Sequence, residues 1–252
     1  MKNNLKVAVF IPTYNAAKTL PIVLDRIPDS IKKNAAEIFV VDDASADNTY
    51  LIGIGYQALY QLPNLKIYKN EKNKGYGGNQ KFAYRYAIDN GFDVVVMLHG
   101  DAQYAPEKLE FLLKPFEKED ADMVFGSRMA EDPLKGGMPL YKFLGNKFLT
   151  KIANIILRMN LSEYHSGYRA YSCHALQEIP FEKCADDFHF DTDIIIQFKL
   201  KGLRIAETPI PTYYGDERCH VNVISYGLNV LLSLFQYWLH AKGIKKIEKY
   251  NF

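Results

Sequence analysis

The sequence predicts an α/β protein whose doubly wound, mostly parallel sheet is flanked by helices and followed by a C-terminal helical segment. Short β-branched runs alternate with helical patterns over the first half of the chain, which is the rhythm of strand–helix–strand units. Polar residues follow the ends of several runs, where open α/β sheets bind their ligands. After residue 128 this alternation gives way to a Gly- and Pro-rich loop and a long helical pattern.

Strands are expected where apolar, β-branched residues run together between turn residues. They cover residues 6–11, 37–41, 65–68, 93–98 and 123–125. Helices are expected over residues 19–27, 48–62, 79–90, 106–116 and 140–160, and from 221 to 239. No repeat or low-complexity linker divides the chain. From the change of pattern along the sequence, we expect an α/β domain over residues 1–215 and a C-terminal helical segment over residues 216–252.

The composition favours a chain that folds on its own and has no nucleic-acid partner. Of 252 residues, 48% are hydrophobic, which is enough for a sizeable core. The 31 basic and 29 acidic residues are mixed along the chain, so no global field attracts nucleic acid. The cysteines Cys173, Cys184 and Cys219 have no metal-binding spacing. We interpret them as reduced, structural residues.

The N-terminal run MKNNLKVAVFIP is short, ends at Pro12 and lacks a small-residue cleavage site. We interpret it as a first strand rather than a signal peptide, which places the start of the chain in the cytosol. The stretch 221–239 is free of charge, but polar residues interrupt it and a membrane span is not expected.

Four basic residues, Lys242, Lys245, Lys246 and Lys249, follow that C-terminal stretch. One interpretation is a peripheral contact with an anionic membrane surface, on the cytoplasmic face. The other is a homo-oligomer helix with a solvated tail.

The first polar cluster follows the second strand. Asp42 and Asp43 end an apolar run and precede Ser45, Asp47 and Asn48. Helix capping explains Asp47 and Asn48, because such side chains accept from free N–H groups at a helix start. For Asp43, at the strand end, we favour ligand binding.

A second cluster, His99-x-Asp101-x-Gln103, follows the fourth strand. In an extended segment, alternating residues project to the same side. Mg²⁺ or Mn²⁺ prefers oxygen ligands and commonly links a carboxylate to substrate phosphates, which suits Asp101 and the carbonyl of Gln103. For His99, metal ligation and a structural hydrogen bond both remain open.

The Gly-rich segment of residues 73–81, NKGYGGNQK, enters a predicted helix. Free backbone N–H groups at such a site favour an anion, so Lys74 and Gly75 are candidates for a phosphate contact. The spacing matches neither a P-loop nor a dinucleotide fingerprint. A flexible turn is the alternative.

Arg128 follows the fifth strand and Arg169 lies in Ser-Gly-Tyr-Arg. Either guanidinium can clamp a phosphate or form a surface ion pair. Further along, Asp191 and Asp193 alternate in Phe-His-Phe-Asp-Thr-Asp. One of these carboxylates is a candidate general base, with helix capping as the alternative.

These segments together resemble the inverting glycosyltransferases of family 2, particularly the dolichol- or polyprenyl-phosphate sugar synthases. The matching pieces are FIPTYN at 10–15, VVDDASADNT at 40–49, NKG at 73–75, LHGDAQY at 98–104 and GSR at 126–128. In order and spacing they span roughly residues 6–215, so the resemblance is specific. It implies a GT-A fold.

The resemblance also implies roles for residues. Pro12, Tyr14 and Asp43 would hold the nucleoside, with Asn15, Lys74 and Gly75 grouped among the nucleotide-sugar contacts. Asp101 and Gln103 would bind Mg²⁺ or Mn²⁺, and Arg128 and Arg169 would approach phosphates. The sequence departs from the family pattern at Ala16, where Glu is common, and at His99, where the metal motif begins with Asp.

The expected reaction is a single displacement at the anomeric carbon, in which the metal and Arg128 stabilise the departing diphosphate of a UDP- or GDP-sugar. A polyprenyl or dolichyl phosphate acceptor is already an anion. A saccharide hydroxyl acceptor needs a base at Asp191 or Asp193. The alternatives are a non-catalytic nucleotide-sugar-binding protein and a nucleotidyltransferase, whose usual Gly-rich loop after the first strand is replaced here by residues 12–15.

Overall fold

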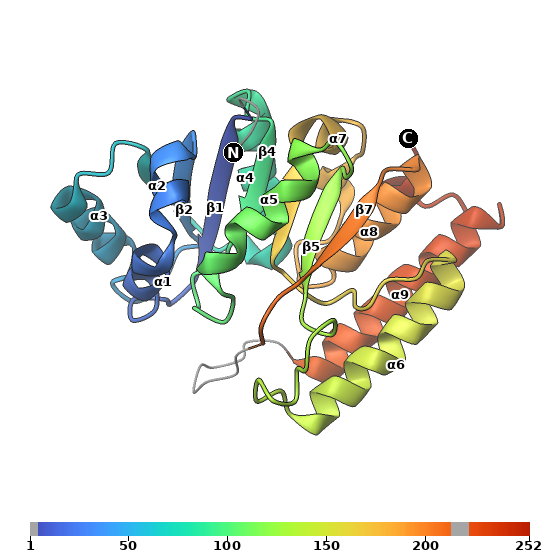
Figure 1. Ribbon diagram of the computed structural model, residues 1–252. Coiled ribbons are helices and arrows are strands. Elements are labelled where there is room, and N and C mark those ends of the chain that lie inside the picture. Colours follow the sequence, from blue (N-terminus) through green and yellow to red (C-terminus); the bar gives the residue numbers. More distant parts are fainter. Residues whose placement is uncertain (1–4, 213–221) are drawn as a thin grey trace.

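A computed structural model describes residues 5–212 and 222–252. Within these residues a seven-stranded sheet carries helices on both faces (Figure 1). The strand order is β3-β2-β1-β4-β6-β5-β7, and all neighbours are parallel except the pairs that β6 makes with β4 and β5. The predicted α/β fold with a mostly parallel sheet is confirmed.

The five predicted strands are all present, and the structure adds two more. The strands are β1 (Val7–Thr13), β2 (Glu37–Asp42), β3 (Leu65–Lys69), β4 (Val94–Met97), β5 (Met123–Ser127), β6 (Arg169–Ser172) and β7 (Ile205–Pro209). The sequence pattern missed β6 and β7. β6 has only four residues and begins with a charged one, and β7 has no buried residue and ends in Glu-Thr-Pro, so neither carries the apolar run of a central strand.

The predicted helices are confirmed with small shifts at their ends. In order, the helices are α1 (Leu20–Arg26), α2 (Asp29–Asn34), α3 (Thr49–Tyr60), α4 (Gly75–Asp89), α5 (Leu109–Glu117), α6 (Leu140–Leu157), α7 (Cys173–Gln177), α8 (Phe190–Lys201) and α9 (Val223–Ala241). Short 3-10 turns cover Pro106–Lys108, Phe181–Lys183 and Glu248–Tyr250. The short helices α2 and α7 were not expected, and α8 was expected only as the helix-capping alternative for Asp191.

Helix α4 begins four residues earlier than predicted, so the Gly-rich segment is its first turn and not a loop. Gly75 takes a φ of +77°, which glycine adopts without strain. A Cβ on Gly77 would lie 2.2 Å from the carbonyl oxygen of Ala185 and 2.8 Å from the Cβ of Phe190. The glycines therefore allow α4 to pack directly against the backbone before α8.

The core has two layers because successive side chains of a strand point to opposite faces of the sheet. From β1, Ala8 and Phe10 join the layer under α4, α7 and α8, whereas Val9 and Ile11 join the layer under α1 and α5. Both layers are buried, which explains why the parallel strands are apolar at nearly every position.

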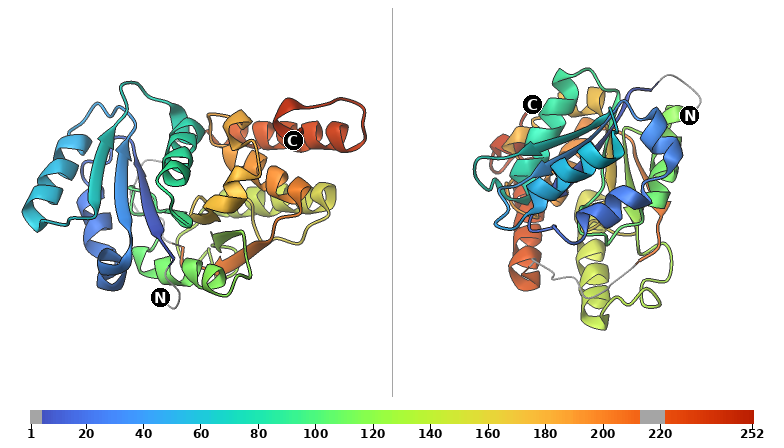
Figure 2. Two further views of the ribbon diagram at one scale, coloured as in Figure 1. Left: turned by 90° about the horizontal axis from the view of Figure 1, so that it is seen from above. Right: turned by 90° about the vertical axis from the view of Figure 1, so that its left-hand side faces the viewer.

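The C-terminal helix packs into this fold. Val230 and Leu234 of α9 belong to the core layer of α4 and α8. α9 also runs beside α6, and the two lie on the side of the molecule away from α3 (Figures 1 and 2). No helix of the described ranges is long and apolar enough to cross a bilayer. The predicted boundary at 215/216 and Cys219 fall outside those ranges, whereas Cys173 and Cys184 are buried free thiols.

Candidate functional site

The predicted polar clusters meet at one edge of the sheet, where β1, β2, β4 and β5 end. Backbone hydrogen bonds tie three of the loops together: the Asp43 N–H donates to the Thr13 carbonyl at 2.8 Å and the Gly100 N–H to the Pro12 carbonyl at 3.1 Å. Asn15, Ala44 and Ala102 take positive φ values of 52°, 57° and 64°. Left-handed backbone in the loops after β1, β2 and β4 turns the chain sharply and keeps the polar residues of each loop at this edge.

Asp43 lies at the bottom of this edge, 4% exposed. Its Oδ1 accepts from the Asn70 amide at 2.7 Å and from the backbone N–H of Lys74 at 2.9 Å. Lys74 therefore contributes a backbone contact that orients Asp43. Both of these hydrogen bonds are to Oδ1, and among residues 5–212 and 222–252 none is made to the Oδ2 of Asp43.

The segment after β1 divides into a structural and an open part. Asn15 donates its N–H to the Ser45 hydroxyl at 2.8 Å and accepts from the Ala46 N–H at 3.0 Å, so it links the first two loops. Ala16, at the position where the family commonly has Glu, is buried and donates its N–H to Thr49 Oγ1 at 2.8 Å. Tyr14 instead presents 45% of its surface to solvent.

The prediction of free N–H groups at the start of α4 is wrong. The N–H groups of Gly77 and Gly78 both donate to the carbonyl oxygen of Asp186, at 2.7 and 3.3 Å. Gly75 donates to the Asn73 side chain at 2.9 Å. A backbone carbonyl thus occupies the position where an anion was expected, because α4 packs end-on against the segment before α8.

Asp101 is the open carboxylate of this edge, with 42% of its side chain exposed. Its Oδ2 lies 3.9 Å from His99 Nδ1, and its Oδ1 accepts from the Gln103 backbone N–H at 3.0 Å. Burial raises the pKa of Asp101, but the His99 ring and the Gln103 N–H together lower it below the ordinary aspartate value. Asp101 is therefore ionised at neutral pH.

Tyr76, which sequence reasoning missed, connects this carboxylate to the candidate base. Its hydroxyl lies 3.4 Å from His99 Nε2 and donates to Asp191 Oδ2 at 2.9 Å. Burial and the charge of Asp191 raise the pKa of Tyr76, so the phenol keeps its proton. Asp101, His99, Tyr76 and Asp191 form one polar chain, and only the position of Tyr76 between Gly75 and Gly77 could have pointed to it.

Asp191 is buried, 4% exposed, yet its Oδ1 has no hydrogen-bond partner among the described residues. The nearest cation is Arg169, whose Nη1 lies 3.6 Å from that oxygen. Burial raises the pKa of Asp191 above the ordinary value, although Arg169 and Tyr76 oppose the shift. A raised pKa and a carboxylate oxygen that accepts no hydrogen bond are properties of a proton acceptor.

Two predicted residues lie apart from any open surface. Arg169 is fully buried and donates to the backbone carbonyls of Ser166, Asp191 and Tyr164 at 2.6 to 2.9 Å. Its guanidinium is enclosed by these carbonyls, so the expected approach to a phosphate is not seen in this arrangement. Asp193, also fully buried, pairs instead with the C-terminal tail.

The partners of Asp193 explain its position. Its Oδ1 lies 2.7 Å from Lys249 Nζ and accepts from the Tyr250 hydroxyl at 3.1 Å. Its Oδ2 accepts from the Ala185 N–H at 3.1 Å. These contacts fasten the residues after α9 to the start of α8, and they use both carboxylate oxygens.

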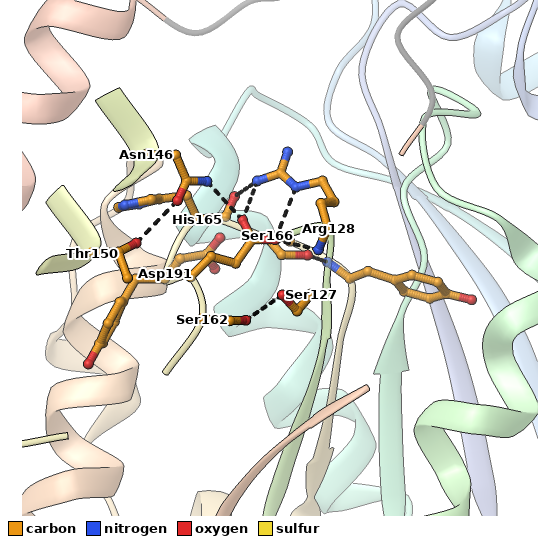
Figure 3. A network of polar contacts seen from close by, with 12 residues as sticks. Ser127, Arg128, Asn146, Thr150, Ser162, His165, Ser166 and Asp191 are labelled. Carbon is orange, nitrogen blue, oxygen red and sulfur yellow. Dashed lines mark hydrogen bonds and ion pairs between the residues drawn. The ribbon is translucent and has the colours of Figure 1, made fainter. Parts of the chain in front are cut away.

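Arg128 is held by a buried carboxylate at the end of β5. Its Nη2 lies 2.7 Å from Glu163 Oε2 and also donates to the His165 carbonyl at 3.0 Å. Asn146 of α6 donates to the same Glu163 oxygen at 3.0 Å. Burial raises the pKa of Glu163, but Arg128 and Asn146 hold it below the ordinary value. Figure 3 shows Arg128, Asn146 and Asp191 around this network.

His165 extends the network to α9. Its Nδ1 lies 2.7 Å from the Tyr226 hydroxyl. Burial lowers the pKa of His165 to about 4, so the ring is neutral at neutral pH. The inner faces of α6 and α9 thus both contact the residues that position Arg128.

The donor set at Asp101 suits a hard divalent cation. Among the described residues no group of three or more His, Cys, Asp or Glu side chains could enclose a metal ion. Mg²⁺ and Mn²⁺ do not need such a cage, because they are commonly held by one or two carboxylates and complete their shell with water and substrate phosphates. An ionised, exposed Asp101 beside His99 fits this kind of site.

Comparison with known proteins identifies the family to which the chain belongs. The model of glycosyl transferase family 2 matches residues 8–180. An undecaprenyl-phosphate mannosyltransferase of Micrococcus luteus is 30% identical over 82% of this chain and 83% of its own length. A UDP-N-acetylglucosamine–dolichyl-phosphate N-acetylglucosaminyltransferase of Methanococcus voltae is 29% identical over 82% and 86%.

Solved structures share the fold. Glucosyl-3-phosphoglycerate synthase from Mycobacterium tuberculosis, solved with Mn²⁺, uridine diphosphate and phosphoglyceric acid, superposes with a TM-score of 0.71 and 18% identity. The alignment covers 93% of this chain and 78% of that one. At this identity the likeness concerns the fold, and it confirms the GT-A type expected from the sequence. With a family model matching more than two thirds of its length, the chain is a glycosyltransferase and belongs to glycosyl transferase family 2.

Proposed function

We propose that the protein transfers a hexose from a UDP- or GDP-sugar to a polyprenyl or dolichyl phosphate, with inversion at the anomeric carbon and with Mg²⁺ or Mn²⁺. The observation that carries this proposal is the position of Asp101. Asp43 is buried and the side chain of Asp191 is only 6% exposed, whereas 42% of the Asp101 side chain remains open at the same edge. It is the candidate carboxylate that a metal-bound diphosphate can reach.

The donor would lie across the ends of β1, β2 and β4. Tyr14 offers an exposed ring for the nucleobase, Pro12 would line the site beside it, and Asp43 supplies a carboxylate oriented by Lys74 and Asn70. Asp101, with His99 and Gln103 beside it, would hold the cation. When bound, the cation neutralises the charge of the departing nucleoside diphosphate.

The roles of the basic residues follow from their partners. Arg128, fixed by Glu163, presents positive charge at the end of β5 without freedom to swing. Preorganised charge of this kind stabilises a developing anion because little reorganisation is needed. Arg169 acts indirectly by orienting Asp191, whose backbone carbonyl and carboxylate it both contacts.

The acceptor class is supported by the names of the relatives, which transfer sugars to undecaprenyl and dolichyl phosphates. A phosphate acceptor is already an anion and attacks without a base. Asp191, with its raised pKa and an Oδ1 that accepts no hydrogen bond from the described residues, favours a second candidate, transfer to a saccharide hydroxyl. In that case Asp191 would accept the hydroxyl proton.

One donor and acceptor panel tests both candidates. The protein is incubated with UDP- and GDP-sugars, Mn²⁺ or Mg²⁺, and either a short-chain prenyl phosphate or a saccharide, and nucleotide release is measured. We expect release only with the prenyl phosphate, and Asp191→Asn should retain it. Release that needs a saccharide and is lost in Asp191→Asn would replace the first candidate with the second.

The cellular location and the oligomeric state of the protein are part of the same proposal. A polyprenyl phosphate acceptor lies in a membrane, so we propose that the protein works at the cytoplasmic face as a peripheral enzyme. In this proposal α9 contacts the membrane surface. The alternative is that α9 forms the contact between two copies of the chain in a homo-oligomer.

A further inference from the structure

The outer faces of α6 and α9 are unusually apolar for exposed helix surfaces. On α6 the exposed residues Leu140, Leu144, Phe148 and Ile155 lie within one stripe, since they are spaced by about one or two helical turns. Their side chains are 56 to 68% exposed. The opposite face of α6, which includes Ala153 and Leu157, is buried.

Helix α9 repeats this pattern. Its exposed stripe consists of Ile224, Leu228, Leu232 and Phe235, which are 52 to 78% exposed. Trp238 extends the stripe and stacks on Phe235 with ring centroids 6.1 Å apart. Since α6 and α9 pack side by side (Figure 1), we call the two stripes together the α6–α9 platform. Patches of this kind mark interaction sites.

The charges on the two helices of the α6–α9 platform all have one sign; the exposed acidic residues Glu131, Asp132 and Glu248 lie outside these helices. Neither helix contains an Asp or Glu. The exposed basic residues are Lys147 and Lys151 on α6, Arg158 at its end, and Lys242, Lys245 and Lys246 after α9. Lys147 and Lys151 fall on the same side of α6 as Leu144 and Phe148, because they are three or four residues from one of them. An apolar stripe bordered by lysines is complementary to an anionic lipid surface.

The same charges disfavour pairing of two copies of the chain through this face. A self-complementary interface would bring lysines against lysines, with no acidic side chain on either helix to neutralise them. Like charges placed opposite each other oppose association. A bilayer that contains anionic headgroups supplies both the apolar phase and the counter-charge.

We propose that the α6–α9 platform docks the protein onto an anionic membrane surface, with α6 contributing as much as the C-terminal helix. This inference rests on the proposed function, because docking serves the reaction only if the acceptor is a lipid phosphate. The inner faces of the platform contact the site: Asn146 of α6 donates to Glu163, which holds Arg128, and Tyr226 of α9 contacts His165. Docking would therefore bring Arg128 near the headgroup region, where a lipid phosphate lies.

The test is co-sedimentation of the full chain with vesicles of phosphatidylcholine alone or with added phosphatidylglycerol. We expect binding to the anionic vesicles that weakens at high ionic strength. The double variant Phe148→Gln, Phe235→Gln should lower the partition coefficient at least about tenfold. Replacing Lys147 and Lys151 by Gln should lower it about fivefold for each lysine.

A matched control uses α3, whose Leu51 and Leu59 are 66 and 74% exposed but whose helix has no basic residue. Leu51→Gln with Leu59→Gln should leave vesicle binding unchanged. An equal loss in this control would overturn the proposal, as would failure of the wild type to bind anionic vesicles. A wild-type dimer that the Phe148, Phe235 variant dissociates, without vesicle binding, would assign the face to self-association instead.

Turnover with a water-soluble short-chain prenyl phosphate separates docking from chemistry. We expect the Phe148, Phe235 variant to keep wild-type nucleotide release in this assay. Platform-dependent vesicle binding by a wild type that transfers no sugar would support the α6–α9 platform and count against the proposed function. Sugar transfer by a wild type that binds no vesicles would support the proposed function and count against the α6–α9 platform.

Discussion

Gly167 offers the sharpest perturbation of the chain of contacts from Asp101 to Asp191. A Cβ at this position would lie 2.5 Å from His99 Nε2 and 2.7 Å from the Tyr76 hydroxyl. Ordinary contacts begin at 3.4 Å. In Gly167→Ala, His99 and Tyr76 must therefore retreat by about 0.9 and 0.7 Å, the differences from that limit.

A shift of this size is expected to cost activity more than stability. Misplacing a catalytic group by about 1 Å lowers rates about a hundredfold, whereas adding a methyl group to a packed site costs about 1–3 kcal/mol. We therefore expect Gly167→Ala to lower kcat/KM for the donor about a hundredfold while the protein remains folded. Steady-state nucleotide release and urea unfolding measure the two quantities.

The control for this substitution is Gly55→Ala, in the exposed part of α3, where a Cβ meets nothing within 4 Å. Alanine in a helix interior should stabilise the protein by about 0.5–1 kcal/mol and leave turnover unchanged. Wild-type kcat/KM in Gly167→Ala would refute the idea that His99 and Tyr76 need their present positions.

Three further predictions concern buried charges. Tyr76→Phe removes the donor 2.9 Å from Asp191, so the pKa of Asp191 should rise further, and a carboxyl NMR titration should show protonation at higher pH than in the wild type; an unchanged midpoint would contradict this. Glu163→Gln removes the buried carboxylate charge 2.7 Å from Arg128 and should cost about 3–5 kcal/mol in urea unfolding at neutral pH; because the folded-state pKa of Glu163 is lowered, the stability that Glu163 contributes is present above its unfolded pKa and disappears as pH falls through the lowered, folded-state pKa. Asp193→Asn should lower the free energy of unfolding but spare turnover per folded molecule, and selective loss of turnover would return Asp193 to the site.

Most of the sheet was predictable because its strands are buried on both faces. β1, β2 and β4 are apolar at nearly every position, and their pattern depends little on tertiary context. The antiparallel insertion of β6 between β4 and β5 was not predictable from that pattern. The four residues of β6 form a strand only because they pair with β4 on one side and β5 on the other.

The location of the candidate site was also predictable, since polar residues after parallel strands meet at one edge. The pairings inside it were not. Glu163, which fixes Arg128, lies 35 residues further along the chain, and Tyr76 contacts Asp191 across 115 residues. Both contacts depend on how the helices pack, and helix packing cannot be predicted from a local sequence pattern.

The same reason explains why the start of α4 was misjudged. Glycines before a helix leave N–H groups free in isolation. Here the Asp186 carbonyl, 108 residues or more away in sequence, takes those of Gly77 and Gly78. Whether a helix start binds an anion thus depends on what the rest of the fold brings to it.

The central claim is that Asp101 holds the divalent cation that binds the donor diphosphate. The direct test is calorimetric binding of UDP and GDP to wild type and to Asp101→Asn, each with Mn²⁺ and with a chelator. We expect Mn²⁺ to tighten nucleotide binding to the wild type and to have no effect on the variant, while the affinity without metal is the same for both. A variant that keeps the full gain from Mn²⁺ would contradict the claim.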